Sequence, residues 1–295
     1  MPHHRPIPAL ILALLAILLW STLAALTVKL RDLPPFLLAG TSLLIGSLAG
    51  IHRWRAWRAP VPVLALGVYG LFAYHAALFT ALRLAPAVEA NLLNYLWPLL
   101  IVVLTPVFFR ERRLTGRHVV AALAGFVGAA LLVTGGRGQP AFDRAHAGGY
   151  ALAIAAAVIW STYSLASARR GAAQAPPVSL FGAVSGLLAL LCHLLFEPRA
   201  TIAAADLPWL LLLGLGPMGA AFIAWDAALR RGDPRTIGLL SYLTPLLSTL
   251  LLALTGGGRL TGVSLAAMVL VVGGALLGTW PVGVRKRPAA PGDRA

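Results

Sequence analysis

Hydrophobic and polar positions alternate along this chain on the scale of whole helices. Predominantly apolar runs of about 20 residues are separated by short polar or arginine-rich turns, and a helix of this length and composition spans a membrane. The sequence therefore predicts an all-α polytopic membrane protein with ten transmembrane helices. The runs occupy residues 8–29, 34–52, 61–83, 86–109, 117–134, 147–168, 176–196, 207–231, 234–255 and 259–281.

Composition and charge add a location to this picture. Of 295 residues, 59% are hydrophobic and 11% are charged, which is too apolar for a soluble protein. The net charge of +15 would suggest nucleic-acid binding in a soluble protein, but here the basic residues gather in the turns. If ten spans alternate in direction, 17 of the 24 Lys and Arg residues fall on one side. We therefore expect cytoplasmic termini, a bacterial inner membrane location, the lipid bilayer as partner and no nucleic acid.

The two halves of the chain share short motifs in the same order. Leucine matches arise from helix packing alone, but an ordered set of polar motifs does not. The sequence predicts two repeats, residues 1–138 and 139–284, and a basic cytoplasmic tail at 285–295. The shared motifs are Trp-Ser-Thr (20–22 and 160–162), Tyr-x-x-Pro (95–98 and 242–245) and Arg-Leu-Thr-Gly (113–116 and 259–262).

The number of spans in each repeat predicts how the repeats are related. Each repeat holds five spans, and because five is odd the second repeat enters the membrane from the opposite side. Inverted repeats of this kind are typical of transporters, in which one central site near the midplane serves two related gates. The predicted architecture is two inverted five-helix repeats around a central cavity.

The fourth span contains polar residues that a lipid-facing helix does not need. At about 100° per residue, Asn91, Asn94, Pro98 and Thr105 fall on one stripe, flanked by Tyr95. Proline displaces the backbone carbonyl four residues earlier, and such a group is tolerated only against protein or a wet cavity. A harmless kink is the alternative for a single proline, but the ninth span repeats the pattern.

Aromatic and ionisable residues near the middle of other spans complete the candidate site. Tryptophan prefers membrane interfaces, so a tryptophan at mid-span is either structural or part of a cavity wall. His75 is a functional candidate, and a neutral histidine bonded to a carbonyl of the next helix is the alternative. The predicted substrate-binding residues are Trp20, Tyr74, His75, Asn91, Asn94, Tyr95, Trp97, Trp160, Ser161, Ser241 and Tyr242, with Pro98, Pro217 and Pro245 as gating kinks.

Other charged residues and motifs have structural interpretations. Glu89 lies in the first turn of its helix with Arg83 nearby, where a carboxylate complements the helix N-terminus. Asp226 and Arg230 are four residues apart and form an expected ion pair. Residues 214–219 fit GxGxxG but follow no strand, so we interpret them as a bend.

Glycines four residues apart favour close helix packing in the second, seventh and tenth spans. Together with Gly125 and Gly128 of the fifth span, the pair Gly274 and Gly278 indicates either packing within the chain or a dimer face. An oligomer is not required by the sequence.

The sequence lacks the signatures of enzymes and of ATP-driven pumps. It has no HExxH, Walker or GxSxG motif, and we expect no cofactor and no metal. No basic or acidic residue is placed at midplane depth, which disfavours carriers of phosphates or lipophilic cations. The remaining aromatic rings, amides, hydroxyls and carbonyls suit a neutral zwitterion with an apolar side chain. This chemistry indicates amino acids as the small-molecule substrate.

The repeated Trp-Ser-Thr, Tyr-x-x-Pro and Arg-Leu-Thr-Gly motifs resemble those of the drug/metabolite transporter superfamily, specifically ten-span exporters with two EamA-type repeats. Residues 92–98, Leu-Leu-Asn-Tyr-Leu-Trp-Pro, are most similar to the YddG-type aromatic amino-acid exporters. The resemblance implies a ten-helix basket whose cavity is lined by spans 1, 3, 4, 6, 8 and 9. One departure is that the acidic residue expected after spans 4 and 9 is present as Glu111 but aligns with Gly257 in the second half.

Our hypothesis is an inner-membrane exporter of amino acids, with aromatic and other apolar ones favoured, that works by alternating access. Transport is either uniport or proton-coupled. The alternative is a broad-specificity efflux carrier for drugs or metabolites. An intramembrane enzyme is a third hypothesis, which the missing catalytic motifs disfavour.

Overall fold

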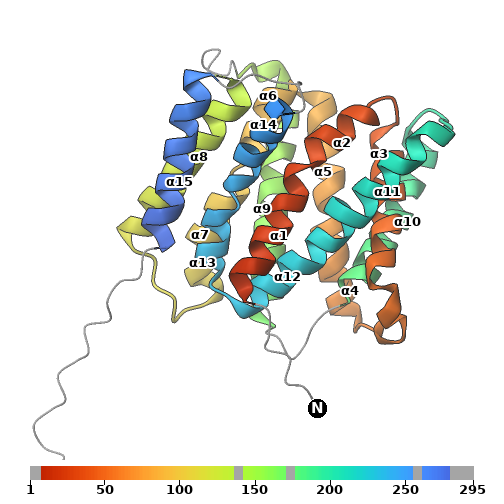
Figure 1. Ribbon diagram of the computed structural model, residues 1–295. Coiled ribbons are helices and arrows are strands. Elements are labelled where there is room, and N and C mark those ends of the chain that lie inside the picture. The colour runs from red at the N-terminus through yellow and green to blue at the C-terminus, as the bar shows by residue number, and fades with distance from the viewer. Residues whose placement is uncertain (1–7, 136–141, 171–176, 255–260, 280–295) are drawn as a thin grey trace, which may run out of the picture.

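The computed structural model describes residues 8–135, 142–170, 177–254 and 261–279. The described residues form helices and turns, with no strand among them, and the helices lie side by side in one bundle (Figure 1). Two features of the sequence analysis, the tail at 285–295 and Gly257, lie outside this part of the chain.

The helices follow the predicted runs closely. In the first half they are α1 (Ala9–Ser21), α2 (Leu23–Lys29), α3 (Pro35–Ser47), α4 (Val61–Val68), α5 (Tyr74–Leu84), α6 (Ala87–Asn94), α7 (Trp97–Phe108) and α8 (Gly116–Thr134). In the second half they are α9 (Ala147–Arg169), α10 (Val178–Phe196), α11 (Leu207–Leu215), α12 (Ala221–Arg231), α13 (Pro234–Leu240), α14 (Leu243–Leu254) and α15 (Gly262–Thr279).

Their length and outer surface confirm a polytopic membrane protein. Within the described ranges, nine helical stretches are long and apolar enough to cross a membrane, and the pair α13 and α14 occupies the remaining predicted span. Large apolar side chains such as Leu194 and Val269 are more than 70% exposed on the outside of the bundle. Such surface requires lipid rather than water around it.

Several spans are broken near their middle. The fourth span is interrupted at Tyr95 and Leu96, directly before α7, and the ninth at Ser241 and Tyr242, directly before α14. Pro98 and Pro245 stand in the first turn after each break, where a proline costs no helical hydrogen bond. The two interruptions lie where the sequence analysis expects the kinks.

The third and eighth spans bend by a different device. Each contains one π-helical turn, Tyr69–Ala73 between α4 and α5 and Gly216–Ala220 between α11 and α12. The two turns are 147 residues apart, the same offset that relates the two Tyr-x-x-Pro motifs. Such turns are frequent at functional sites. Pro217 marks the second turn in the sequence, but no residue of the first signals it.

Glycine-lined helix pairs form the two flanks of the bundle. The pair α3 and α10 lies on one flank and the pair α8 and α15 on the other, with α1, α7, α9 and α12 between them (Figure 1). A Cβ on Gly274 would stand 2.8 Å from the carbonyl of Ala121, and one on Gly186 would stand 2.9 Å from that of Gly40. The glycine spacing therefore serves packing within the chain, the first of the two alternatives.

A buried polar cluster joins three helices at the end where α3 begins. The Glu197 carboxylate, which follows α10, accepts from the backbone N–H of Phe36 at 3.0 Å and from Arg83 of α5 at 2.5 Å. His193 contacts the same carboxylate at 2.9 Å. Arg83 was expected beside Glu89, but its ion pair is with Glu197. No local sequence pattern predicts that Glu197 lies next to Arg83.

Candidate substrate site: an aromatic cluster at the broken spans

Three tryptophans from distant spans meet in the middle of the bundle. Trp20 of α1 lies 6.3 Å from Trp97 of α7 and 5.8 Å from Trp160 of α9, measured between ring centroids. Trp97 and Trp160 are 6.4 Å apart, and all three pairs are edge-to-face. This is the favoured geometry for aromatic pairs. The structure thus brings together the three residues that the sequence places at one depth.

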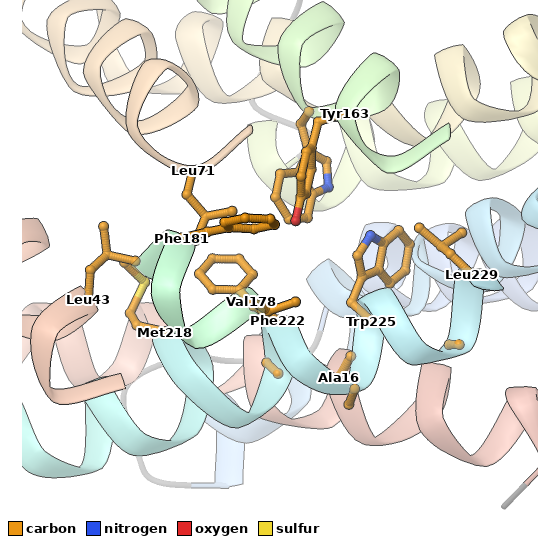
Figure 2. Close-up of a cluster of buried hydrophobic side chains, with 14 of the residues drawn as sticks. Ala16, Leu43, Leu71, Tyr163, Val178, Phe181, Met218, Phe222, Trp225 and Leu229 are labelled. Carbon is orange, nitrogen blue, oxygen red and sulfur yellow. The ribbon is translucent and has the colours of Figure 1, made fainter. Parts of the chain in front are cut away.

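Helix α12 supplies two further rings that the sequence analysis missed. Trp225 lies 5.1 Å from Trp20, and Phe222 lies 5.5 Å from Trp160. Figure 2 shows the side chain of Trp225 extending from α12 toward α9. A signal for Phe222 was present, because it stands 147 residues after His75 and is therefore its equivalent in the repeat.

The third span reaches the same cluster. The ring of Tyr74 lies 5.3 Å from Trp160, and the imidazole of His75 lies 6.1 Å from Phe222. His75 is buried, and its Nδ1 is 2.6 Å from the carbonyl oxygen of Leu71, one turn earlier in the same span. A carbonyl partner was one of the two interpretations of His75, although it comes from its own helix rather than the next.

Asn94 is a buried polar residue that contacts the cluster through Tyr74. It ends α6 directly before the break, is buried, and donates from Nδ2 to the hydroxyl of Tyr74 at 3.3 Å. Its carbonyl oxygen, Oδ1, is buried without a partner among the described residues. Buried polar atoms normally have a hydrogen-bond partner, so this one needs an explanation. Tyr95 lies in the break and Asn91 one turn earlier, both half-buried.

Three other predicted site residues lie in the packing instead. The hydroxyl of Ser161 donates to the carbonyl of Ala157 at 2.8 Å, and that of Ser241 donates to Gly238 at 2.6 Å. Tyr242 is fully buried in a separate apolar cluster and lies over Gly125 of α8. The hydroxyls of the two serines are therefore bonded to their own helices, and Tyr242 packs on α8.

Two of the rings are fixed by their indole N–H groups. Trp20 donates to the carbonyl of Pro217 at 3.1 Å, so the π-helical turn of the eighth span supplies the acceptor. Trp225 donates to the hydroxyl of Ser164 on α9, also at 3.1 Å. A buried indole N–H requires such a partner. The bend at Pro217 thus positions Trp20 within the cluster.

Charges beside the cluster are paired. Asp226, the neighbour of Trp225, forms the expected ion pair with Arg230 and also accepts from Ser167 of α9. Both side chains of the ion pair are at least 90% buried. Among the described residues, no group of His, Cys, Asp and Glu could hold a metal ion. The site is therefore aromatic and neutral, with hydrogen-bonding groups at one edge.

Within the described residues, the main contact between the two broken spans is at one end of the bundle. Helix α7 packs on α13, where a Cβ on Gly238 would stand 2.9 Å from Ile101. Ion pairs hold the same end, because Asp233 lies 3.0 Å from Arg112 and 2.7 Å from Arg235. Toward the other end, α6 packs on α5, α8 and α9, whereas α14 packs on α1, α2, α8 and α15.

Comparison with known proteins assigns this architecture. A family model described as the EamA-like transporter family matches residues 7–134 and, separately, residues 147–280. The chain belongs to the EamA-like transporter family. It is therefore a multi-pass membrane transporter of the drug/metabolite transporter superfamily.

Relatives within the EamA-like family carry closely related names. A protein of Ancylobacter novellus named aromatic amino acid exporter YddG is 42% identical over 278 residues, which are 92% of this chain and 96% of the relative. The protein of the same name from Escherichia coli is 26% identical, covering 91% of this chain and 96% of its own. A crystal structure that is 42% identical superposes with a TM-score of 0.87, covering 92% of this chain and 96% of its own.

Proposed function

We propose that this transporter exports amino acids across the bacterial inner membrane, with aromatic and other apolar amino acids favoured. The EamA-like family and the exporter names of its relatives support the class of activity. The aromatic cluster supports the choice of side chain, because ring edges and faces from α1, α7, α9 and α12 accept a flat apolar group.

One pair of side chains carries the proposal furthest. The Tyr74 hydroxyl accepts from Asn94 Nδ2, so its own proton remains available to donate to a carboxylate. The Oδ1 atom of Asn94 has no partner in the described part of the chain and is available to accept from an ammonium group. The pair therefore offers one donor and one acceptor beside a wall of aromatic rings. That combination is complementary to a zwitterionic aromatic amino acid.

Alternating access would use the breaks in the fourth and ninth spans as hinges. In the conformation described, α7 and α13 are packed together and tied by Asp233, Arg112 and Arg235. We infer that this is the cytoplasmic end, since most basic residues lie on this side when the ten spans alternate. Substrate would enter here when the α7 and α13 contact opens, and leave between α6 and α14 after it closes.

Counterflow in proteoliposomes tests the proposal. Purified protein is reconstituted with unlabelled amino acid inside, and entry of labelled phenylalanine is followed. We expect exchange for phenylalanine and tryptophan, and a raised KM for Tyr74→Phe, because the hydroxyl that binds the carboxylate is gone. Tyr150→Phe is the matched control, since that hydroxyl lies far from the tryptophans, next to Asp143.

The same assay separates the alternatives. Exchange of unrelated drugs or metabolites in place of amino acids would favour a broad efflux carrier and overturn the proposal. Recovery of a chemically altered substrate would favour an enzyme. Dependence of net flux on an imposed pH gradient, and its loss in His75→Gln, would distinguish proton coupling from uniport.

A further inference from the structure

A concave groove lies at the arginine-rich end of the bundle, at the ends of helices that also contribute to the aromatic cluster. It has a volume of about 620 Å³. The groove is formed where α7 ends and α9 ends, near the contact between α7 and α13. Its lining residues are Val107, Phe108, Phe109, Arg110, Glu111 and Arg169.

The chemistry of this groove has three parts. Arg110 and Arg169 provide two guanidinium groups, which prefer carboxylates or phosphates. Glu111 provides one carboxylate, largely exposed and only 3.8 Å from the guanidinium of Arg112. Phe108 and Phe109 provide apolar ring surface, and both are half-buried. Opposite charges beside aromatic rings are the groups that a zwitterionic aromatic molecule requires.

The groove and the aromatic cluster share their helices. Trp97 begins α7 and Phe108 ends it, which is about 16 Å at 1.5 Å per residue. Trp160 and Arg169 are separated along α9 by about 13 Å on the same scale. Both helices contribute residues to each site, and the groove lies at the arginine-rich end of both.

We propose that this groove is a loading site that binds the amino acid before it reaches the tryptophans. Arg110 and Arg169 bind the substrate carboxylate, Glu111 binds its ammonium group, and Phe108 and Phe109 contact its side chain. This inference rests on the proposed export function and on the cytoplasmic position of the arginine-rich end. It adds a second specificity determinant, one built from charges rather than from neutral groups.

The test uses inverted membrane vesicles, which expose the cytoplasmic face, and measures uptake of labelled phenylalanine. In the Arg110→Gln/Arg169→Gln variant we expect KM to rise roughly five- to tenfold with kcat nearly unchanged. This is the loss of binding affinity expected when two exposed ion pairs are removed. Arg231→Gln is the matched control, because it removes an exposed arginine at the end of α12 that does not line the groove. An equal rise of KM in the control would assign the effect to the overall electrostatic field of the basic residues at this end and would overturn the proposal.

Substrate analogues provide a readout that a structural role would not change. Phenylalaninamide lacks the carboxylate and 3-phenylpropanoate lacks the ammonium group, and each competes with labelled phenylalanine. The double arginine variant should reduce the preference for phenylalanine over phenylalaninamide by roughly fivefold. Glu111→Gln should instead reduce the preference over 3-phenylpropanoate. Unchanged preferences in both variants would overturn the proposal.

Lipid headgroups share the chemistry of the carboxylate, so a second arm distinguishes them. The KM comparison is repeated in proteoliposomes of neutral phosphatidylcholine and in vesicles containing phosphatidylglycerol. A difference between wild type and double variant that appears only with phosphatidylglycerol would assign the arginines to lipid and overturn the loading site. If the wild type transports phenylalanine while the variant keeps its KM, only this inference fails; if the wild type transports no amino acid, the proposed function fails with it.

Discussion

The fourth and ninth spans share a Tyr-x-x-Pro motif and a break, but their side chains face different surroundings. At the first break, Asn94 reaches Tyr74 and Trp97 joins the tryptophan rings. At the second break, Ser241 donates back to its own helix and Tyr242 lies over Gly125. The side chains of the first break therefore contact the candidate site, and those of the second pack against their own helix and α8.

The difference shows that backbone and side chains have separate roles in the repeat. The prolines set the position of both breaks, and this part of the pattern is symmetric. The residues beside them are not, since Trp97 corresponds to Thr244 and Asn94 to Ser241 at the offset of 147. We infer that the first repeat contributes most of the substrate contacts of this pair and that the second contributes the packing against which it moves.

The largest expected effect follows from making the first break resemble the second. Trp97→Thr removes a buried ring with several aromatic neighbours, and truncating such a ring typically costs about 3–5 kcal/mol. We expect phenylalanine exchange to be lost and thermal stability in detergent to fall. Thr244→Ala is the control, because the hydroxyl of Thr244 has no partner within the described ranges. Equal losses in the two variants would contradict the asymmetry.

A smaller effect is expected from crowding the second break. In Gly125→Val the new side chain would collide with the ring of Tyr242, and overpacking of this kind costs about 1–3 kcal/mol. The melting temperature should fall while the KM of the surviving protein stays unchanged. Adding Tyr242→Ala should recover part of the stability, because the clash is removed. A raised KM in the single variant would instead place Tyr242 in the site.

The third effect concerns the polar residue of each break. Asn94→Ala removes the acceptor beside the tryptophan rings that we assign to the substrate ammonium group, and a hydrogen bond to a charged group contributes about 1.5–3 kcal/mol. We expect the KM for phenylalanine to rise at least about tenfold. Ser241→Ala removes only a bond to its own helix and should leave KM within about twofold. The comparison fails if the two variants behave alike.

The sequence predicts much of this asymmetric pair but not all of it. Hydrophobic runs and proline positions are local properties, so the helices and the breaks before Pro98 and Pro245 could be placed in advance. The direction of a side chain depends on which helix packs beside it. That is why Ser241 and Tyr242, predicted from their repeat equivalents, lie in the packing.

The residues that the sequence analysis missed were missed for the same physical reason. Trp225 belongs to no repeated motif, and only the packing of α12 on α1 and α9 brings it to the rings. The carboxylate of Glu197 meets Arg83 and the start of α3 across more than 100 positions of sequence. Contacts of this separation have no periodicity to detect, whereas the ion pair of Asp226 and Arg230 falls within one helical turn and was predicted.

The smallest expected effect tests the closed end of the second broken span. Burial alone would raise the pKa of the Asp233 carboxyl, but hydrogen bonds from Arg235 and the charges of Arg235 and Arg112 outweigh burial and lower that pKa. The stabilisation by Asp233 is therefore fully present above the unfolded pKa of about 3.9 and is lost as pH falls through the lower folded value. Asp233 also caps α13, so Asp233→Asn should cost about 1 kcal/mol or less at pH 7. Melting temperatures of wild type and variant should differ equally at pH 7 and pH 5 and should begin to converge below about pH 4. The exposed Asp32→Asn is the control. Convergence already at pH 5 would mean that Asp233 does not hold α7 and α13 together in this way.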